Sequence, residues 1–322
     1  MTAAPNGSST NGSSSLDPYT KLCQDVSGPN ANPRAKFVLD SLMKHLHLFA
    51  REVQLTNEEW LGACDLLIRS GQMSDDRRNE LILISDVLGL ESLVDSMAYE
   101  RAQASSGSAN KAAGGLEATQ SAILGPFFRA GAPSYPNGSD IVLDHTITSA
   151  EGKLGESAYM HGRVTDAATG KPIVGAVIDV WHTGPNGLYE QQDPAQPDFN
   201  YRGKFTTDND GYYAFRCLRP TSYPIPYDGG AGDILKLLDR SPMRPAHIHL
   251  LVEANGYKQL ITQIFDSKCE YLGSDAVFAD KSALTIDFVP PQSEQAKKSG
   301  SQHEVTYDIR LVADNQTWKS TH

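Results

Sequence analysis

The sequence predicts a mainly β protein of the α+β class, in which a helical N-terminal region precedes an antiparallel β-sandwich. From Pro33 to about Gln103, apolar residues recur every three or four positions, the spacing of one helix face. After Ile123 the chain consists of short alternating runs separated by Pro and Gly, a pattern typical of a sandwich or barrel. The stretch from Ser105 to Gly115 is rich in Ser, Gly and Ala and predicts a linker. The expected divisions are a disordered tail over 1–20, a helical domain over 21–115 and a sandwich over 116–322.

Composition narrows the class of protein. The chain has 322 residues, of which 39% are apolar, enough for a sizeable core. A formal net charge of -11 argues against nucleic-acid binding, which needs clustered Lys and Arg. No run is long and apolar enough to span a membrane, and no secretory signal is visible. The four cysteines form no C-x-x-C pair. We therefore expect a cytoplasmic protein with small-molecule partners.

The tail and the helices are expected for different reasons. Residues 1–20 are mostly Ser, Asn and Gly, a composition that buries too little apolar surface to offset the entropy of ordering. In the helical region, Thr56 and Glu59 form the pattern of a capping box ahead of an apolar run. Ser74 is expected to cap the following helix, and Gly89 to end it.

The sandwich is indicated by strands and turns. Val174–Val180 and Tyr212–Phe215 are brief alternating runs of the strand type. Asp208–Gly211 is expected to form a turn, because Asn, Asp and Gly tolerate positive φ. The final strand is expected over Glu304–Val312.

Two histidines in Arg244-Pro245-Ala246-His247-Ile248-His249 are the first candidates for a metal site. On a strand, residues two apart share a face and lie about 6.6 Å apart along it, a gap that one metal ion can bridge. Glu253 lies on the same face, so a divalent site of the cupin type is one alternative, although position 241 is Ser where cupins expect Gly. A second alternative is a pair of histidines that only form hydrogen bonds.

A different alternative comes from the upstream strands. His161–Asp166, Thr169–Ala176 and Thr206–Phe215 resemble the prealbumin-like sandwich modules attached to carboxypeptidases and adhesins. Those modules bind or act as spacers and do not catalyse. This resemblance implies a prealbumin-like antiparallel sandwich and leaves the function open.

Three segments taken in order distinguish the alternatives. Val180-Trp181-His182 leads into Gly187-Leu188-Tyr189, a second tyrosine follows in Ser222-Tyr223-Pro224-Ile225-Pro226, and the histidine motif comes third. In this order they resemble the intradiol ring-cleaving dioxygenases, and the resemblance covers nearly all of the chain after about Asp40. It implies a soluble enzyme of aromatic catabolism that uses O₂ and a small aromatic diol or triol.

The resemblance also implies the site residues, which spacing could not select from 13 tyrosines. The family's Fe(III) ligands fall on Tyr189, Tyr223, His247 and His249. Substrate is implied to displace Tyr223, which then takes a proton, while Arg244 stabilises negative charge and Gln263 supports it. Two phenolates suit ferric iron because they neutralise much of its charge. A surface salt bridge for Arg244 and a backbone-satisfying role for Gln263 are the simpler alternatives.

The preferred ring is expected to be hydroxyquinol, benzene-1,2,4-triol. Tyr223-Pro224-Ile225-Pro226, Ser274–Phe278 and Leu83–Gly89 resemble the hydroxyquinol subgroup, and Asp86 is placed to accept a hydrogen bond from the third hydroxyl. Gln263 instead resembles the catechol form, so catechol is the alternative substrate. The residues expected to line the substrate pocket are Leu83, Asp86, Ile123, Leu124, Gly125, Ile225, Pro226 and Val277.

The same resemblance implies a role for the helical domain. In the family it forms a homodimer contact and can hold a lipid in an apolar tunnel. A bundle packed only for stability is the alternative.

Overall fold

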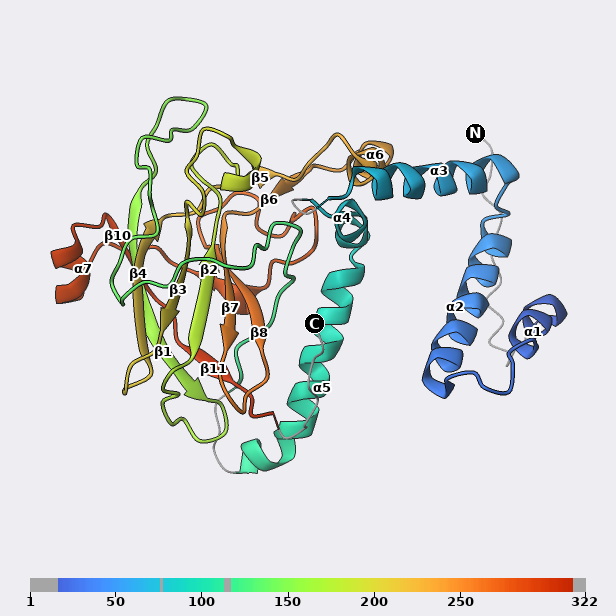
Figure 1. Cartoon of the computed structure of the whole chain (residues 1–322), viewed down its shortest axis with the longest axis horizontal. Helices are drawn as coiled ribbons and strands as arrows, with labels where there is room; N and C mark the ends of the chain where they lie inside the picture. Colours follow the sequence, from blue (N-terminus) through green and yellow to red (C-terminus); the bar gives the residue numbers. More distant parts are fainter. Residues whose placement is uncertain (1–16, 76–77, 113–116, 315–322) are drawn as a thin grey trace, which may run out of the picture. The chain divides into compact units, whose positions relative to one another are not determined.

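The computed structural model describes residues 17–75, 78–112 and 117–314 (Figure 1). Contacts within the chain divide it into two units, Met1–Leu66 and Leu67–His322. Most of the predicted tail, residues 1–16, lies outside the described residues. The prediction that the tail extends to residue 20 is wrong, because helix α1 covers Pro18–Asp25. Asp17 caps this helix by accepting hydrogen bonds from the backbone N–H groups of Tyr19 and Thr20.

The first unit contains α1, α2 and the first part of α3, and its helices expose apolar side chains such as Phe37 and Phe49. Helix α2 covers Pro33–Glu52, begins with Pro at its first position after the Asn32 cap, and buries no residue. Helix α3 covers Asn57–Met73 and begins with the predicted capping box. Thr56 N–H donates to Glu59 and Glu59 N–H donates to the Thr56 hydroxyl, which confirms that prediction.

Helices α4 and α5 belong to the second unit. Helix α4 covers Glu80–Val87 and ends at Gly89, as predicted, where φ is +74°. Its cap is Asn79 and not Ser74, although the Ser74 hydroxyl accepts a hydrogen bond from the backbone of Glu80. Five residues of α4, including Glu80, are buried. The domain boundary expected near residue 115 differs from the observed one, because contacts divide the chain between residues 66 and 67.

The predicted linker is largely helical. Helix α5 covers Leu90–Ala112 and therefore runs through most of the segment expected as a linker, whose last residues, 113–115, lie outside the described part. The segment contains no proline before Ala112, and its alanines favour helix enough to tolerate Gly107.

Two sheets and a short ribbon make up the sandwich (Figure 1), which confirms the fold class. In the first sheet β1 lies between β4 on one side and β10 and β11 on the other, and the second sheet has the order β3-β2-β7-β8-β9. The strands are β1 (Ser157–Asp166), β2 (Val177–Trp181), β3 (Arg202–Thr206), β4 (Tyr212–Leu218), β5 (Tyr223–Pro224), β6 (Met243–Arg244), β7 (His247–Glu253), β8 (Leu260–Asp266), β9 (Thr285–Ile286), β10 (His303–Thr306) and β11 (Ile309–Leu311). The remaining helices are η1 (Glu190–Gln192), α6 (Gly230–Leu237), η2 (Ser282–Leu284) and α7 (Glu294–Ser299).

The pairing is mostly antiparallel, but β10 and β11 run parallel to β1, and β9 runs parallel to β8. The single final strand expected over 304–312 is divided in two. At the break, the Tyr307 carbonyl crosses Gly162 so closely that a Cβ there would lie 1.9 Å from the oxygen. Only glycine permits this approach, and it separates β10 from β11.

The main core fills the space between the two sheets. Strand β7 contributes Ile248, Leu250 and Val252 to it, and β2 contributes Ile178 and Val180. Because side chains alternate along a strand, His247 and His249 lie on the outer face of their sheet, away from this core. The predicted Asp208–Gly211 turn is present, with Gly211 at φ +69°. All four cysteines are free. In the described part of the chain, no helix is both long and apolar enough to cross a membrane.

Candidate active site

Strand register places three side chains in a row on the outer face of the second sheet. His249 of β7 pairs with Trp181 of β2 on one side and with Gln263 of β8 on the other. The Trp181 ring stacks on the His249 imidazole, with 4.7 Å between centroids and 8° between planes. His249 is thus held between an aromatic ring and a polar side chain.

The two imidazoles converge. Their Nε2 atoms are 3.1 Å apart, and both rings are almost fully buried. His247 Nδ1 lies 2.6 Å from the Pro245 carbonyl, which can only accept, so Nδ1 carries the proton and Nε2 has the lone pair. Burial lowers the pKa of both histidines well below the usual value, and the positive charge of Arg244 adds to the effect. Neutral imidazoles with free Nε2 lone pairs are the form that binds metals.

The two tyrosines reach the same point from separate loops. Tyr189 precedes η1, and Tyr223 lies in β5, where it pairs with Arg244 of β6. The two hydroxyls are 2.9 Å apart, and the Tyr223 hydroxyl is 3.4 Å from His247 Nε2. Gly187 has φ +76°, and a Cβ there would lie 3.2 Å from Tyr223 Cβ, so glycine lets the two loops approach.

The four polar atoms have the spacing of one coordination shell. With metal–ligand bonds of roughly 2.0–2.1 Å, ligand atoms about 90–110° apart are separated by about 2.9–3.4 Å. The observed separations of 2.9, 3.1 and 3.4 Å fall in this range. Burial raises the pKa of Tyr189 and of Tyr223, so both phenols are neutral unless a bound cation stabilises the phenolate. Tyr189, Tyr223, His247 and His249 therefore fit a highly charged metal ion.

Arg244 lies beside this group of ligands and is buried. Its Nη1 is 3.1 Å from His247 Nε2, and its Nη2 donates to Gln263 Oε1 at 2.7 Å. Nε and the same Nη2 also donate to the two carboxylate oxygens of Asp275, each at 3.1 Å. Arg244 is thus no surface side chain, and every nitrogen of its guanidinium has a partner.

Gln263 links Arg244 to the chain around Ile123. Its side-chain carbonyl accepts from Arg244, and its amide nitrogen donates to the Ile123 carbonyl at 2.7 Å. Nearby, Gly125 has φ +74°, and a Cβ on it would lie 3.5 Å from His249. Leu124 packs against the cluster that contains Trp181 and both tyrosines.

The other residues expected to line a pocket lie on three separate segments. Val277 is buried, and its N–H donates to Asp275. Ile225 and Pro226 follow Tyr223 and line a cavity of about 660 Å³ together with Phe127 and Leu188. Leu83 and Asp86 are buried on α4.

Asp86 is a buried carboxyl with neither oxygen in a well-formed hydrogen bond within the described part of the chain. Burial raises its pKa to about 9, the neighbouring Glu91 adds to the shift, and the charge of Arg244 opposes it. Asp86 therefore lies within electrostatic reach of Arg244 and is protonated at neutral pH.

The cupin alternative is wrong. Glu253 is at the far end of β7, exposed, and its carboxylate accepts a hydrogen bond from Gln259. In the described residues, no group of three or more His, Cys, Asp and Glu side chains is placed to hold a metal ion. The ligand geometry instead needs the two tyrosines.

The sequence did not identify two ion pairs that support the site. Asp275 pairs with Arg244, and Glu190 pairs with Arg202, whose Nε lies 2.6 Å from the Glu190 carboxylate. Arg202 also donates to the Phe127 carbonyl, and its guanidinium lies 5.7 Å from the centre of the Tyr189 ring. Because a buried arginine needs a carboxylate partner, the burial of Arg244 would have been a signal for Asp275.

Comparisons with known proteins agree with this geometry. Residues 130–313 match the family model described as Dioxygenase, and residues 32–106 match the model described as Catechol dioxygenase N terminus. The chain belongs to the intradiol ring-cleavage dioxygenase family. It is 45% identical over 299 residues to a catechol 1,2-dioxygenase of Candida albicans, covering 92% of each chain. It is 41% identical over 258 residues to a hydroxyquinol 1,2-dioxygenase of Rhizobium sp., covering 80% of each chain.

Solved structures of the intradiol family are similar over more than nine-tenths of the chain. A hydroxyquinol 1,2-dioxygenase from Pseudomonas putida has a TM-score of 0.75 at 36% identity and covers 92% of this chain and 98% of its own. A catechol 1,2-dioxygenase from Acinetobacter radioresistens has a TM-score of 0.75 at 28% identity and covers 95% of each chain. Membership in this family, which generally depends on non-haem iron, decides against the non-catalytic sandwich module.

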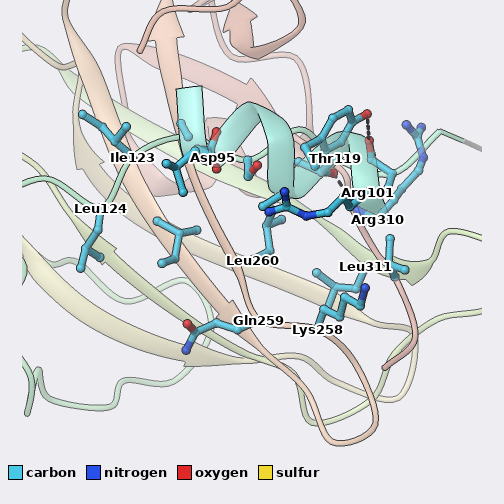
Figure 2. A pocket seen from close by; sticks show the side chains of 18 of the residues that line it. Asp95, Arg101, Thr119, Ile123, Leu124, Lys258, Gln259, Leu260, Arg310 and Leu311 are labelled. Atoms are coloured by element: carbon cyan, nitrogen blue, oxygen red, sulfur yellow. Dashed lines mark hydrogen bonds between the residues drawn. The ribbon is translucent and has the colours of Figure 1, made fainter. Parts of the chain in front are cut away.

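A second cavity of about 660 Å³ lies between α5 and the beginning of β8 (Figure 2). Its walls are largely apolar and include Ile123, Leu124 and Leu260, two of which were expected in the substrate pocket. Figure 2 shows basic side chains, among them Arg101 and Arg310, toward the end away from Leu124. The cavity combines an apolar interior with a cationic rim.

Proposed function

We propose that this protein is a hydroxyquinol 1,2-dioxygenase. It cleaves benzene-1,2,4-triol between the adjacent hydroxylated carbons with O₂. The product is 3-hydroxy-cis,cis-muconate, the enol tautomer of maleylacetate. The observation that carries this choice is Asp86, a buried carboxyl near Arg244 whose oxygens lack a well-formed hydrogen bond. We place the reaction in the cytoplasm, since all four cysteines are free thiols.

The metal we propose is Fe(III), bound by Tyr189, Tyr223, His247 and His249. Ferric iron held by these four side chains would supply an electron-accepting centre that activates an aromatic diol toward O₂. The protein supplies two neutral imidazoles and two phenols whose raised pKa requires a strong cation for ionisation. Hard phenolate oxygens favour a hard trivalent ion over a divalent one.

Tyr223 is suited to accept a proton, and Arg244 is suited to stabilise negative charge on the substrate. Burial raises the pKa of Tyr223, so a Tyr223 phenolate would be a strong base, suited to accept a proton from the substrate hydroxyl. The lone pair of His247 Nε2 cannot serve both a metal and Arg244 Nη1. Once His247 binds metal, Nη1 loses that acceptor and becomes available to an anionic substrate oxygen.

Asp86 is suited to select the triol. Because it is protonated at neutral pH, it offers a carbonyl oxygen that accepts and a hydroxyl that donates. The third hydroxyl of benzene-1,2,4-triol can donate to its carbonyl oxygen, whereas catechol offers that buried oxygen no donor. A site that hydrogen-bonds a substrate hydroxyl discriminates strongly against an analogue that lacks it.

Catechol is the second candidate, with cis,cis-muconate as product. The 45% identity to a catechol 1,2-dioxygenase favours it, as does Gln263, where the hydroxyquinol subgroup often has His. Oxygen uptake by the iron-loaded protein with each substrate tests the choice. We expect kcat/KM for the triol to exceed that for catechol by at least about tenfold, which is about 1.4 kcal/mol of transition-state discrimination. Equal or greater efficiency with catechol contradicts the proposal.

We further propose that the helical domain forms a homodimer and binds a lipid. Supporting the dimer, α2 exposes Phe37, Leu42, Leu46 and Phe49, each at least half exposed. Supporting a lipid, the cavity in Figure 2 joins an apolar interior to Arg101, Lys258 and Arg310, none of which has a carboxylate within 4 Å in the described residues. Sedimentation equilibrium and mass spectrometry of organic extracts test the two parts. A monomer at micromolar concentration contradicts the first, and a lipid-free extract contradicts the second.

A further inference from the structure

The carboxylate of Asp275 meets four donors. It accepts from Arg244 Nε and Nη2 at 3.1 Å each, and from the backbone N–H groups of Val277 and Ala279 at 3.2 Å each. The side chain is fully buried, and it is the one carboxylate within 4 Å of Arg244 in the described residues. One side chain therefore joins the guanidinium to the backbone of the 275–279 turn.

That turn borders the expected substrate pocket, and side chains from other segments also form hydrogen bonds with its backbone. The Val277 carbonyl accepts from the Ser92 hydroxyl at 2.9 Å, and the Ala276 carbonyl accepts from Arg240 at 2.8 Å. Phe278 adopts a left-handed φ of +58°, a strained conformation for an aromatic residue that the surrounding bonds maintain. The Asp275 carboxylate anchors the backbone of this turn on the side that faces Arg244.

Arg244 has few other constraints. Besides Asp275, its guanidinium makes one hydrogen bond to Gln263, approaches His247 through Nη1, which a bound metal would prevent, and lies beside the Tyr223 hydroxyl. A bidentate pair with a carboxylate fixes the plane of a guanidinium, which a single hydrogen bond does not. Fixed donors stabilise developing charge far better than donors that must reorganise.

We infer that Asp275 is the positioning residue of this site: it orients Arg244 toward the reacting oxygens and couples that orientation to the substrate-lining turn at Val277. The inference rests on the proposed function. It adds a residue that acts through Arg244 and does not itself touch substrate. In kinetic terms, loss of Asp275 should affect the chemical step more than the binding of substrate.

The experiment is a double-mutant cycle on the iron-loaded protein with the better of the two substrates. D275N is expected to lower kcat on the order of 10- to 100-fold with a smaller change in KM. R244M is expected to lower kcat at least as much. Because Asp275 acts through Arg244, the D275N/R244M double variant should be no slower than R244M alone. If the two losses multiply, or if D275N leaves kcat unchanged, the inference is wrong.

A control and a second measurement separate positioning from folding. Glu304 is also a buried carboxylate that accepts from two backbone N–H groups, those of Gln292 and Ser293, but it lies in β10 of the other sheet. E304Q should lose stability and keep kcat. Hydrogen exchange of the metal-free protein should show faster exchange at residues 277–279 in D275N and not in E304Q. Unchanged exchange contradicts the coupling to the turn, whereas a wild-type protein inactive on both substrates would contradict only the proposed function.

Discussion

Replacing Asp86 with Asn should change how stability depends on pH. Burial raises the pKa of Asp86 to about 9 in the folded protein, against about 3.9 in an unfolded chain. Between these values the folded state holds one proton more than the unfolded state, so the free energy of unfolding falls as pH rises. The slope is about 1.4 kcal/mol per pH unit for one proton. From about pH 5.5 to about pH 7.5 the wild type should therefore lose about 2.7 kcal/mol relative to D86N.

Urea unfolding of the metal-free protein at both pH values measures this difference, and a chelator prevents metal binding from adding its own pH dependence. D166N is the matched control with the opposite shift, because against the opposing effect of burial the hydrogen bonds from Thr169 and from the Ala168 backbone lower the pKa of Asp166. Its contribution is complete above the unfolded pKa and disappears only in acid, so D166N should differ from the wild type by a constant amount over this range. If the free energies of unfolding of the wild type and D86N change equally with pH, Asp86 is ionised in the folded protein. The argument for a neutral hydrogen-bonding carboxyl then fails.

Two further substitutions, with a third as a control, test the proposed ligands and the ion pair beside them. Y223F should shift or bleach the phenolate-to-iron absorption of the loaded protein and slow turnover, and an unchanged visible spectrum would remove Tyr223 from the ligands. E190Q leaves Arg202 buried without its carboxylate, so it should cost about 3–5 kcal/mol in urea unfolding. Arg129, which also contacts Glu190, is about one-third exposed, and replacing it should cost under about 1 kcal/mol. Equal losses at the two positions would contradict the role given to burial.

The sequence predicted those features that depend on local pattern. The capping box at Thr56, the helix end at Gly89 and the turn at Asp208–Gly211 each rest on the backbone preferences of a few adjacent residues. The fold class followed from the change in apolar period after Ile123. Placement of the two histidines on one strand face followed from alternation alone.

Features that depend on distant contacts were less accessible. The helical course of residues 105–112 and the break between β10 and β11 were missed, and the break depends on Gly162, well over a hundred residues away in sequence. Tyr189 and Tyr223 could be selected only through the family resemblance, because no local pattern brings two loops together. Asp275 was visible as part of a motif, but its partner became apparent only when Arg244 proved to be buried.

The two faces of strand β7 have different roles. Ile248, Leu250 and Val252 complete the packing between the sheets, while His247 and His249 face the other way, toward Tyr223, Gln263 and Trp181. The segments proposed to line the substrate pocket come from four distant parts of the sequence, around residues 86, 124, 225 and 277. During evolution, one such segment could be exchanged to suit a new ring substituent while the β7 register and its core contacts stayed unchanged. A one-residue slip of that register, by contrast, would bury both imidazoles in the sandwich and abolish every activity of the fold at once.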